Sequence, residues 1–169
     1  MTPALQKLIL GTTAAAARDT GPEPQALLSA IRGCLFDLDL LAEEHRRADP
    51  ASYTRHLLHA DPRGLFSIMA IVWSPGQGSP VHAHQTWCAV GVYAGELTES
   101  HYRVAPGDAF PVRTGSVRHG EGDSCFDSAH HGIHRIANES DRLAISIHIY
   151  GVGADQILTG VNRVYPGPH

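Results

Sequence analysis

Residues 76–95 have the sequence GQGSPVHAHQTWCAVGVYAG, and this stretch decides the fold. His82 and His84 stand two positions apart in it, and side chains at that spacing share one face of a β-strand. Both imidazoles can therefore reach the same metal ion. The pair alone is weak evidence, because chance in a chain with 12 histidines, or two solvated surface histidines, would give the same pattern.

The glycines around the pair strengthen the interpretation. Five residues separate Gly76 from His82, and six separate Cys88 from Gly95. This spacing resembles the first motif of the cupins, in which a Glu occupies the position of Cys88. The resemblance implies a mainly β fold, a cupin barrel of the double-stranded β-helix or jelly-roll type.

A third histidine belongs to a second pattern near the C-terminus. His134 is followed four residues later by Asn138, which resembles the second cupin motif. His130 and His131 compete as candidates, but they lie in a polar stretch, whereas His134 leads into an apolar strand. We therefore expect His134 to join the first two imidazoles.

Three neutral imidazoles without a carboxylate have a chemical consequence. They leave the full +2 charge on the ion and leave coordination positions open, so an anionic substrate and dioxygen can bind together. Imidazole suits zinc, copper and nickel as well as iron, so the ligand set does not identify the metal.

Residues 146–150, SIHIY, alternate polar and apolar side chains. Ser146, His148 and Tyr150 therefore share one strand face, and the isoleucines occupy the other. Buried polar groups must be hydrogen-bonded, and a relay from Ser146 through His148 to Tyr150 would satisfy all three. The alternative interpretation is a solvated sheet face.

The N-terminal part of the chain has a helical pattern up to about residue 47. Pro24 suits the first turn of a helix, and Asp49-Pro50 closes the segment. Apolar residues with helical spacing are Leu5, Leu8 and Ile9, and then Leu27, Leu28, Ile31, Leu35, Leu38 and Leu41.

Short strands and turns follow. We predict strands over residues 53–59, 65–73, 81–84, 86–93, 97–104, 133–137 and 143–150. Residues 115–128 are polar, and we expect them to be irregular. The whole chain, 1–169, is expected to form a single cupin domain, with a helical segment over 1–48 and the β-barrel over 49–169.

Composition excludes several classes of function. The chain has 169 residues, 43% of them hydrophobic, and a net charge of −4, so we expect a packed core and no nucleic-acid surface. We find no leader peptide and no span of about 20 apolar residues, and we expect a cytoplasmic protein without a membrane partner. Three cysteines argue against a disulfide framework. A monomer or small homo-oligomer is expected.

Taken together, these segments resemble the cysteine dioxygenase family of cupins, which includes 3-mercaptopropionate and other thiol dioxygenases. The similarity runs from about Tyr53 to Tyr150. The segments that carry it are residues 53–57 (YTRHL), 66–73 (FSIMAIVW), 75–78 (PGQG), 82–84 (HAH), Cys88 with 95–97 (GEL), His134 with Asn138, and 146–150 (SIHIY).

The resemblance implies a metal centre and a covalent modification. His82, His84 and His134 would bind Fe(II). Cys88 matches the cysteine that forms a thioether crosslink with the tyrosine in animal cysteine dioxygenases, and the tyrosine here is Tyr150. From the residue alone, Cys88 could equally be a small buried hydrophobe.

The resemblance also implies a substrate and a reaction. Tyr150 would lie beside the substrate with Ser146 and His148 behind it, and Arg55 would pair with the substrate carboxylate through its guanidinium fork. We expect a small thiol and O2 as reactants and a sulfinic acid as product. Bacterial mercaptopropionate dioxygenases have Gln at the position of Arg55, so the retained Arg55 favours cysteine as the substrate. The alternatives among thiols are 3-mercaptopropionate and mercaptosuccinate. The alternatives are a zinc or manganese isomerase or hydrolase, and a non-catalytic cupin that senses a metal or thiol.

Overall fold

The structure is a computed structural model that describes residues 1–17, 21–107, 109–129, 132–157, 159 and 161–166. The described helices are α1 (Pro3–Ala16), α2 (Pro24–Arg32) and the 3-10 helices Glu43–Arg46 and Ala154–Gln156. The described strands are β1 (Thr54–Ala60), β2 (Ser67–Trp73), β3 (His82–His84), β4 (Cys88–Ala94), β5 (Glu96–Arg103), β6 (Val112–Gly120), β7 (Ser124–Asp127), β8 (Ile133–Ala137), β9 (Ala144–Tyr150) and β10 (Asn162–Val164).

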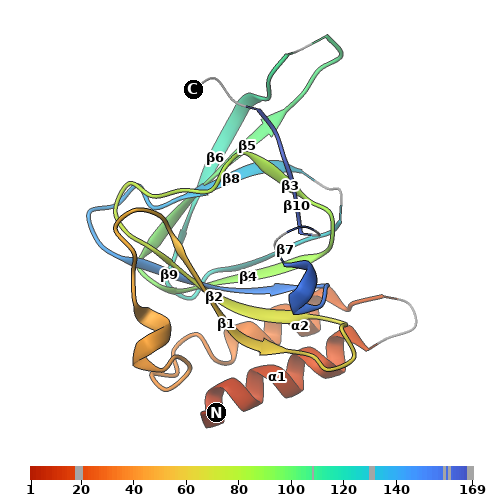
Figure 1. The fold of residues 1–169 in the computed structure, drawn as a ribbon, viewed down its shortest axis with the longest axis vertical. Coiled ribbons are helices and arrows are strands. Elements are labelled where there is room, and N and C mark those ends of the chain that lie inside the picture. The colour runs from red at the N-terminus through yellow and green to blue at the C-terminus, as the bar shows by residue number, and fades with distance from the viewer. Residues whose placement is uncertain (18–20, 108, 130–131, 158, 160, 167–169) are drawn as a thin grey trace.

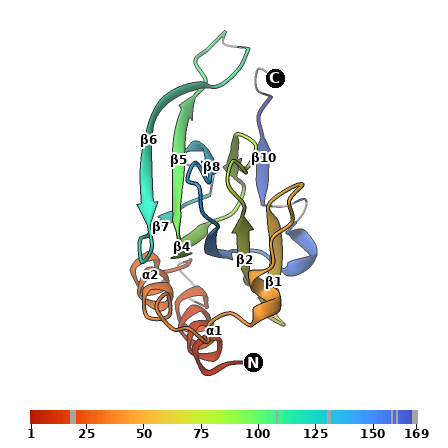
Figure 2. The same cartoon turned by 90° about the vertical axis from the view of Figure 1, so that its left-hand side faces the viewer.

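The strands form two five-stranded sheets that face each other (Figure 1). One has the order β1-β2-β9-β4-β7 and the other β10-β3-β8-β5-β6, and every pairing is antiparallel. The two helices cover the outer face of the first sheet, and the β5–β6 hairpin projects beyond the rest of the second (Figures 1 and 2). This is the mainly β, two-sheet arrangement with N-terminal helices that the sequence predicts.

Alternation along the strands of the first sheet separates the core from the space between the sheets. The three isoleucines at 145, 147 and 149 join one hydrophobic cluster with Leu8, Leu27 and Ile31 of the helices. The residues between them point the other way, since His148 and Tyr150 line the cavity between the sheets and Ser146 contacts His148. The predicted two-faced strand is therefore confirmed, and its polar face is buried.

The chain crosses between the sheets at Gly95, the last glycine of the first motif. Its φ of 74° lies in the left-handed region, and a Cβ at this position would come within 2.7 Å of the Leu143 carbonyl oxygen. Only glycine fits both constraints without strain, which explains its place between β4 and β5.

The predicted second helix is too long. Helix α2 ends at Arg32, and the chain continues in turns to Leu41, with Leu38 85% exposed. Gly33 has low helix propensity, and its carbonyl accepts a hydrogen bond from Lys7 Nζ of α1 at 2.6 Å. Successive three-residue turns then bury Leu35 without a helix.

The expectation that residues 115–128 are irregular is wrong. They contain most of strand β6 and all of β7. Strand β6 lies at the edge of its sheet and is exposed over residues 112–118, so its side chains show no alternation of apolar and polar types. The short strand β10, also at an edge, was not predicted.

No helix among the described residues is both long enough and apolar enough to cross a membrane.

Gly91 in β4 is the close-contact point between the sheet and α2. A Cβ at this position would lie 2.3 Å from Ile31 Cγ2. Gly91→Ala is therefore expected to destabilise the protein by about 1–3 kcal/mol through overpacking. Urea unfolding checks this, with Gly115→Ala as the control, because a Cβ there meets no atom within 4 Å. Equal stability of the two variants would contradict this account of the α2 contact.

Candidate metal centre and surrounding cavity

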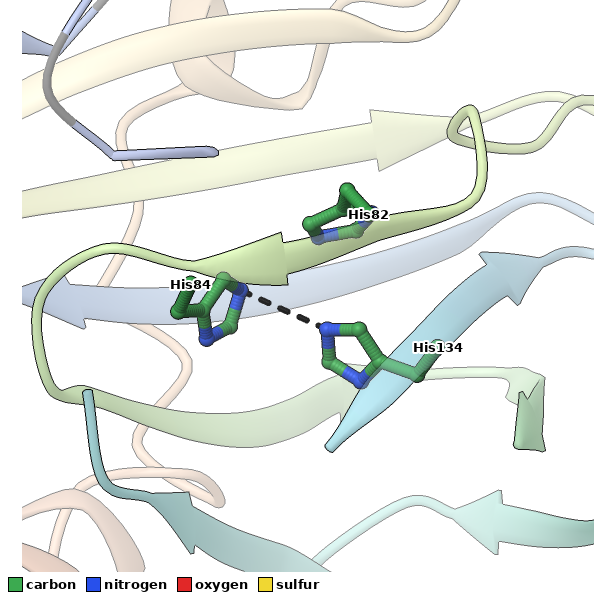
Figure 3. Close-up of side chains that lie close together, drawn as sticks. All are labelled: His82, His84 and His134. Carbon is green, nitrogen blue, oxygen red and sulfur yellow. Dashed lines mark hydrogen bonds between the residues drawn. The ribbon is translucent and has the colours of Figure 1, made fainter. Parts of the chain in front are cut away.

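The structure brings the three predicted imidazoles together on the inner face of the second sheet. His82 and His84 lie on β3, and His134 lies on β8 directly opposite His82 (Figure 3). All three are buried, and one ring nitrogen from each lies within 4.8 Å of the others. A search of the described residues for three or more His, Cys, Asp or Glu side chains that could hold a metal ion together finds this group.

The arrangement of the ring nitrogens fits a metal ion. His82 Nδ1 lies 2.9 Å from the Pro80 carbonyl oxygen, and His134 Nδ1 lies 2.6 Å from Glu99 Oε1, so their Nε2 atoms are left to act as donors. The Nε2 atoms of His84 and His134 are 3.4 Å apart. Metal–nitrogen bonds of about 2.0–2.1 Å, as for zinc, place two ligand nitrogens roughly 3.0–3.4 Å apart.

Metal binding requires a neutral imidazole. Burial and the neighbouring His134 together lower the pKa of His82 to about 3. His82 thus reaches the centre with an unprotonated nitrogen available at physiological pH.

Glu99 on β5 is a functional candidate that the sequence reasoning missed. Its Oε1 contacts His134 Nδ1, and its Oε2 lies 2.9 Å from His119 Nε2. Burial raises the pKa of the Glu99 carboxyl, but the hydrogen bonds with His119 and His134 outweigh it and hold that pKa below its ordinary value. Strand alternation could have revealed Glu99, because it shares the inward face of β5 with Leu97 and His101.

His119, on the edge strand β6, belongs to the same network and is half-buried. Its ring lines the cavity, and the hydrogen bond to Glu99 raises its pKa. His119 thereby anchors the carboxylate that in turn holds His134.

A second carboxylate lies behind His84. Asp127 Oδ2 is 3.3 Å from His84 Nδ1, although this buried nitrogen has no aligned hydrogen bond. The expected group of three imidazoles without a carboxylate is therefore present. Asp127 and Glu99 flank it from behind and would offset the charge of a bound cation.

The relay predicted for β9 is present. Ser146 Oγ lies 2.8 Å from His148 Nε2, and His148 Nδ1 lies 3.0 Å from Tyr150 Oη. Burial lowers the pKa of His148 well below its ordinary value and raises that of Tyr150 well above it. The relay is therefore neutral at physiological pH and not a solvated face.

Arg55 lies at the rim of the same cavity. It is an exposed residue on β1 whose Nη2 donates to Tyr53 Oη at 2.8 Å, and its guanidinium lies 5.0 Å from the centre of the Tyr53 ring. Tyr53 in turn stacks on Trp73, with ring centroids 4.6 Å apart. These aromatic contacts hold the guanidinium in place. Among the described residues no carboxylate forms an ion pair with Arg55, so its cation can pair with an anionic ligand.

One cavity of about 330 Å³ connects these groups. It is large enough for a small organic ligand. Its walls include Arg55, Trp73, the three imidazoles, Glu99, His119, His148 and Tyr150.

Cys88 lies directly opposite Tyr150 in the β4–β9 pairing. Both residues are buried and both line the cavity. Burial raises the pKa of the Cys88 thiol well above its ordinary value. Cys125 also lines the cavity, and burial raises its pKa to about 12.

The remaining candidates from the two motifs have different outcomes. His130 and His131, the rivals of His134, lie outside the described residues. Asn138 is fully buried, and its Nδ2 donates to the carbonyl oxygens of Trp73 and Arg142. It therefore holds the ends of β2 and β9 and does not line the cavity.

Comparison with known proteins agrees with this geometry. The sequence profile of the family described as cysteine dioxygenase type I matches residues 41–159. Cysteine dioxygenase type 1 from Rattus norvegicus is 28% identical over 131 residues, which cover 76% of this chain and 63% of the rat protein, and the Mus musculus protein gives the same values. The chain thus spans less than two thirds of the length of these curated relatives.

Solved structures support the fold. A conserved protein from Klebsiella pneumoniae with a double-stranded β-helix domain superposes with a TM-score of 0.51 at 15% identity, over 78% of this chain and 100% of that one. At this identity the likeness concerns the fold alone. The cupin fold predicted from the sequence is thereby confirmed.

Proposed function

Because this chain belongs to the cysteine dioxygenase type I family, we propose that it is a non-haem Fe(II) dioxygenase that oxidises a small carboxylate-bearing thiol to the sulfinic acid. The observation that carries the proposal is the convergence of four features on one cavity. These are three buried and convergent imidazoles, a guanidinium at the rim, a buried phenol, and a volume of about 330 Å³.

In this proposal His82, His84 and His134 hold the iron, which supplies the redox chemistry between thiol and dioxygen when bound. The overall reaction adds both atoms of O2 to the thiol R–SH and gives R–SO2H, so atoms and electrons balance without another reductant. The protein contributes orientation. Arg55 binds the substrate carboxylate, and Tyr150 forms a hydrogen bond inside the cavity. These contacts hold the substrate sulfur close to dioxygen before they react.

Cysteine is the substrate we favour, because Arg55 stands where the bacterial mercaptopropionate dioxygenases have Gln. 3-Mercaptopropionate and mercaptosuccinate are the alternatives. Parallel measurement of kcat/KM for the three thiols, with the product identified by mass, decides among them. If iron-loaded protein bound a thiol tightly but formed no sulfinate, the dioxygenase proposal would give way to that of a non-catalytic thiol sensor.

Arg55→Gln is expected to raise KM for the thiol roughly tenfold with a smaller change in kcat. A charge-assisted hydrogen bond contributes about 1.5–3 kcal/mol, and exposure at the rim reduces that figure. Steady-state kinetics check this, with Arg113→Gln on the exposed strand β6 as the matched control. An unchanged KM would remove Arg55 from the substrate site.

We further propose that Cys88 and Tyr150 form a thioether. A new S–C bond would replace the thiol S–H and one ring C–H, and the two hydrogens with their electrons would pass to dioxygen. Tandem mass spectrometry of protein that has turned over thiol in air is expected to show the two peptides linked and lacking two hydrogen atoms. Cys125→Ser is the control and should still form the link, whereas separate peptides after turnover would disprove it.

A further inference from the structure

Trp73 adds a fourth member to the relay on β9. Its indole Nε1 lies 2.9 Å from Ser146 Oγ, and both residues are buried between the two sheets. The chain of hydrogen bonds therefore runs from Trp73 through Ser146 and His148 to Tyr150. The distances alone leave open which nitrogen of His148 carries the proton.

The chemistry of the indole settles the first bond. An indole N–H can only donate, so Ser146 Oγ accepts from Trp73. Ser146 is fully buried, and His148 Nε2 is the other polar atom recorded in contact with its hydroxyl among the described residues. If Nε2 carried the proton, Oγ would accept twice and its own hydrogen would be buried without an acceptor, which is costly. Ser146 must therefore donate to His148 Nε2.

The rest of the chain follows from this direction. With Nε2 accepting, the single proton of the neutral imidazole sits on Nδ1 and is donated to Tyr150 Oη. Burial, which lowers the pKa of His148, supports the neutral form. The phenol oxygen then accepts from His148, and its own O–H is not used within the relay.

We infer that Trp73 is a positioning residue that fixes the direction of this hydrogen-bond chain, so that Tyr150 serves the cavity as a hydrogen-bond donor. The identity of the group that receives this bond rests on the proposed function, in which it is the thiol substrate or dioxygen. The direction of the chain does not depend on that function.

The direct test is the tautomer of His148. We would record long-range 1H–15N correlations on the full-length protein, labelled with 15N-histidine and loaded with zinc, a diamagnetic ion that three imidazoles bind. The spectrum of His148→Gln assigns the signals. We expect a protonated Nδ1 and an unprotonated Nε2, and a proton on Nε2 or on both nitrogens would overturn the inference. Zinc-loaded protein does not need to oxidise a thiol, so failure of the proposed activity would leave this result standing.

Trp73→Phe tests the role of the indole itself. The phenyl ring keeps an aromatic face toward Tyr53 but removes the N–H. A water molecule can then occupy the vacated volume and accept from the Ser146 hydroxyl, which leaves Ser146 Oγ able to accept from His148. We expect a measurable shift of His148 toward the Nε2-protonated form. The control is Trp87→Phe, since Trp87 packs on Phe126, and it should keep the Nδ1 form. An unchanged tautomer in Trp73→Phe would assign the direction to Ser146 alone.

Discussion

Replacing His134 by alanine is expected to weaken metal binding by more than about 100-fold and to abolish thiol oxidation. His134 supplies one of three convergent nitrogens, and its removal leaves two imidazoles on the short strand β3. Even the loss of a group behind a ligand typically costs 10–100-fold in affinity, and the loss of the ligand itself should cost more. Metal content after dialysis, measured by elemental analysis, checks the first part, and sulfinate formation checks the second.

The matched control is His45→Ala, because His45 lies in the 3-10 helix at 43–46 and outside the cavity. It should retain the metal and the activity of the unaltered protein. Full metal occupancy in His134→Ala would contradict the assignment of His134 as a ligand and would return His130 and His131 as candidates.

Glu99→Gln is expected to weaken metal binding by about 10–100-fold while the protein remains folded. Glutamine has nearly the size of glutamate. However, it offers only one acceptor oxygen, whereas His134 and His119 each contact a different oxygen of Glu99. An NH2 group would then face His134 or His119, and the charge that offsets the cation would be lost. Competition with a metal-binding dye measures the affinity for zinc directly.

Glu96→Gln provides the comparison on the same strand. Glu96 contacts Arg118 at 3.6 Å on the surface, and such exposed pairs contribute little to stability or function. The affinity of the Glu96→Gln variant for zinc should equal that of the unaltered protein. If Glu99→Gln bound zinc equally well, Glu99 would be a structural residue of the barrel and not a partner of the metal centre.

Much of the barrel could be predicted from single strands. In β9, three isoleucines alternate with three polar residues. This uninterrupted alternation identifies a strand with two different faces, even though both faces are buried. The imidazole pair on β3 could also be predicted, because two histidines separated by one residue share a face whenever the segment is a strand. The second motif then identified His134, which the structure places opposite His82.

What could not be predicted depends on contacts distant in sequence. Strand β6 forms because β5 offers it a partner, and its own exposed residues have no period. Helix α2 ends at Arg32, directly before Gly33, and turns replace the helix although the apolar spacing continues. The importance of Glu99 lies in its contacts with β6 and β8, and the donor–acceptor direction of the relay lies in Trp73 of another strand.

We expect the protein to add both atoms of dioxygen to a thiol that is bound in this cavity. Iron-loaded protein would be mixed anaerobically with cysteine and then given 18O-labelled dioxygen in unlabelled water, with the product weighed by mass spectrometry. Our account predicts cysteine sulfinate carrying two labelled oxygen atoms, with one O2 consumed per thiol. Disulfide as the sole product, or sulfinate with oxygen drawn from water, would contradict it.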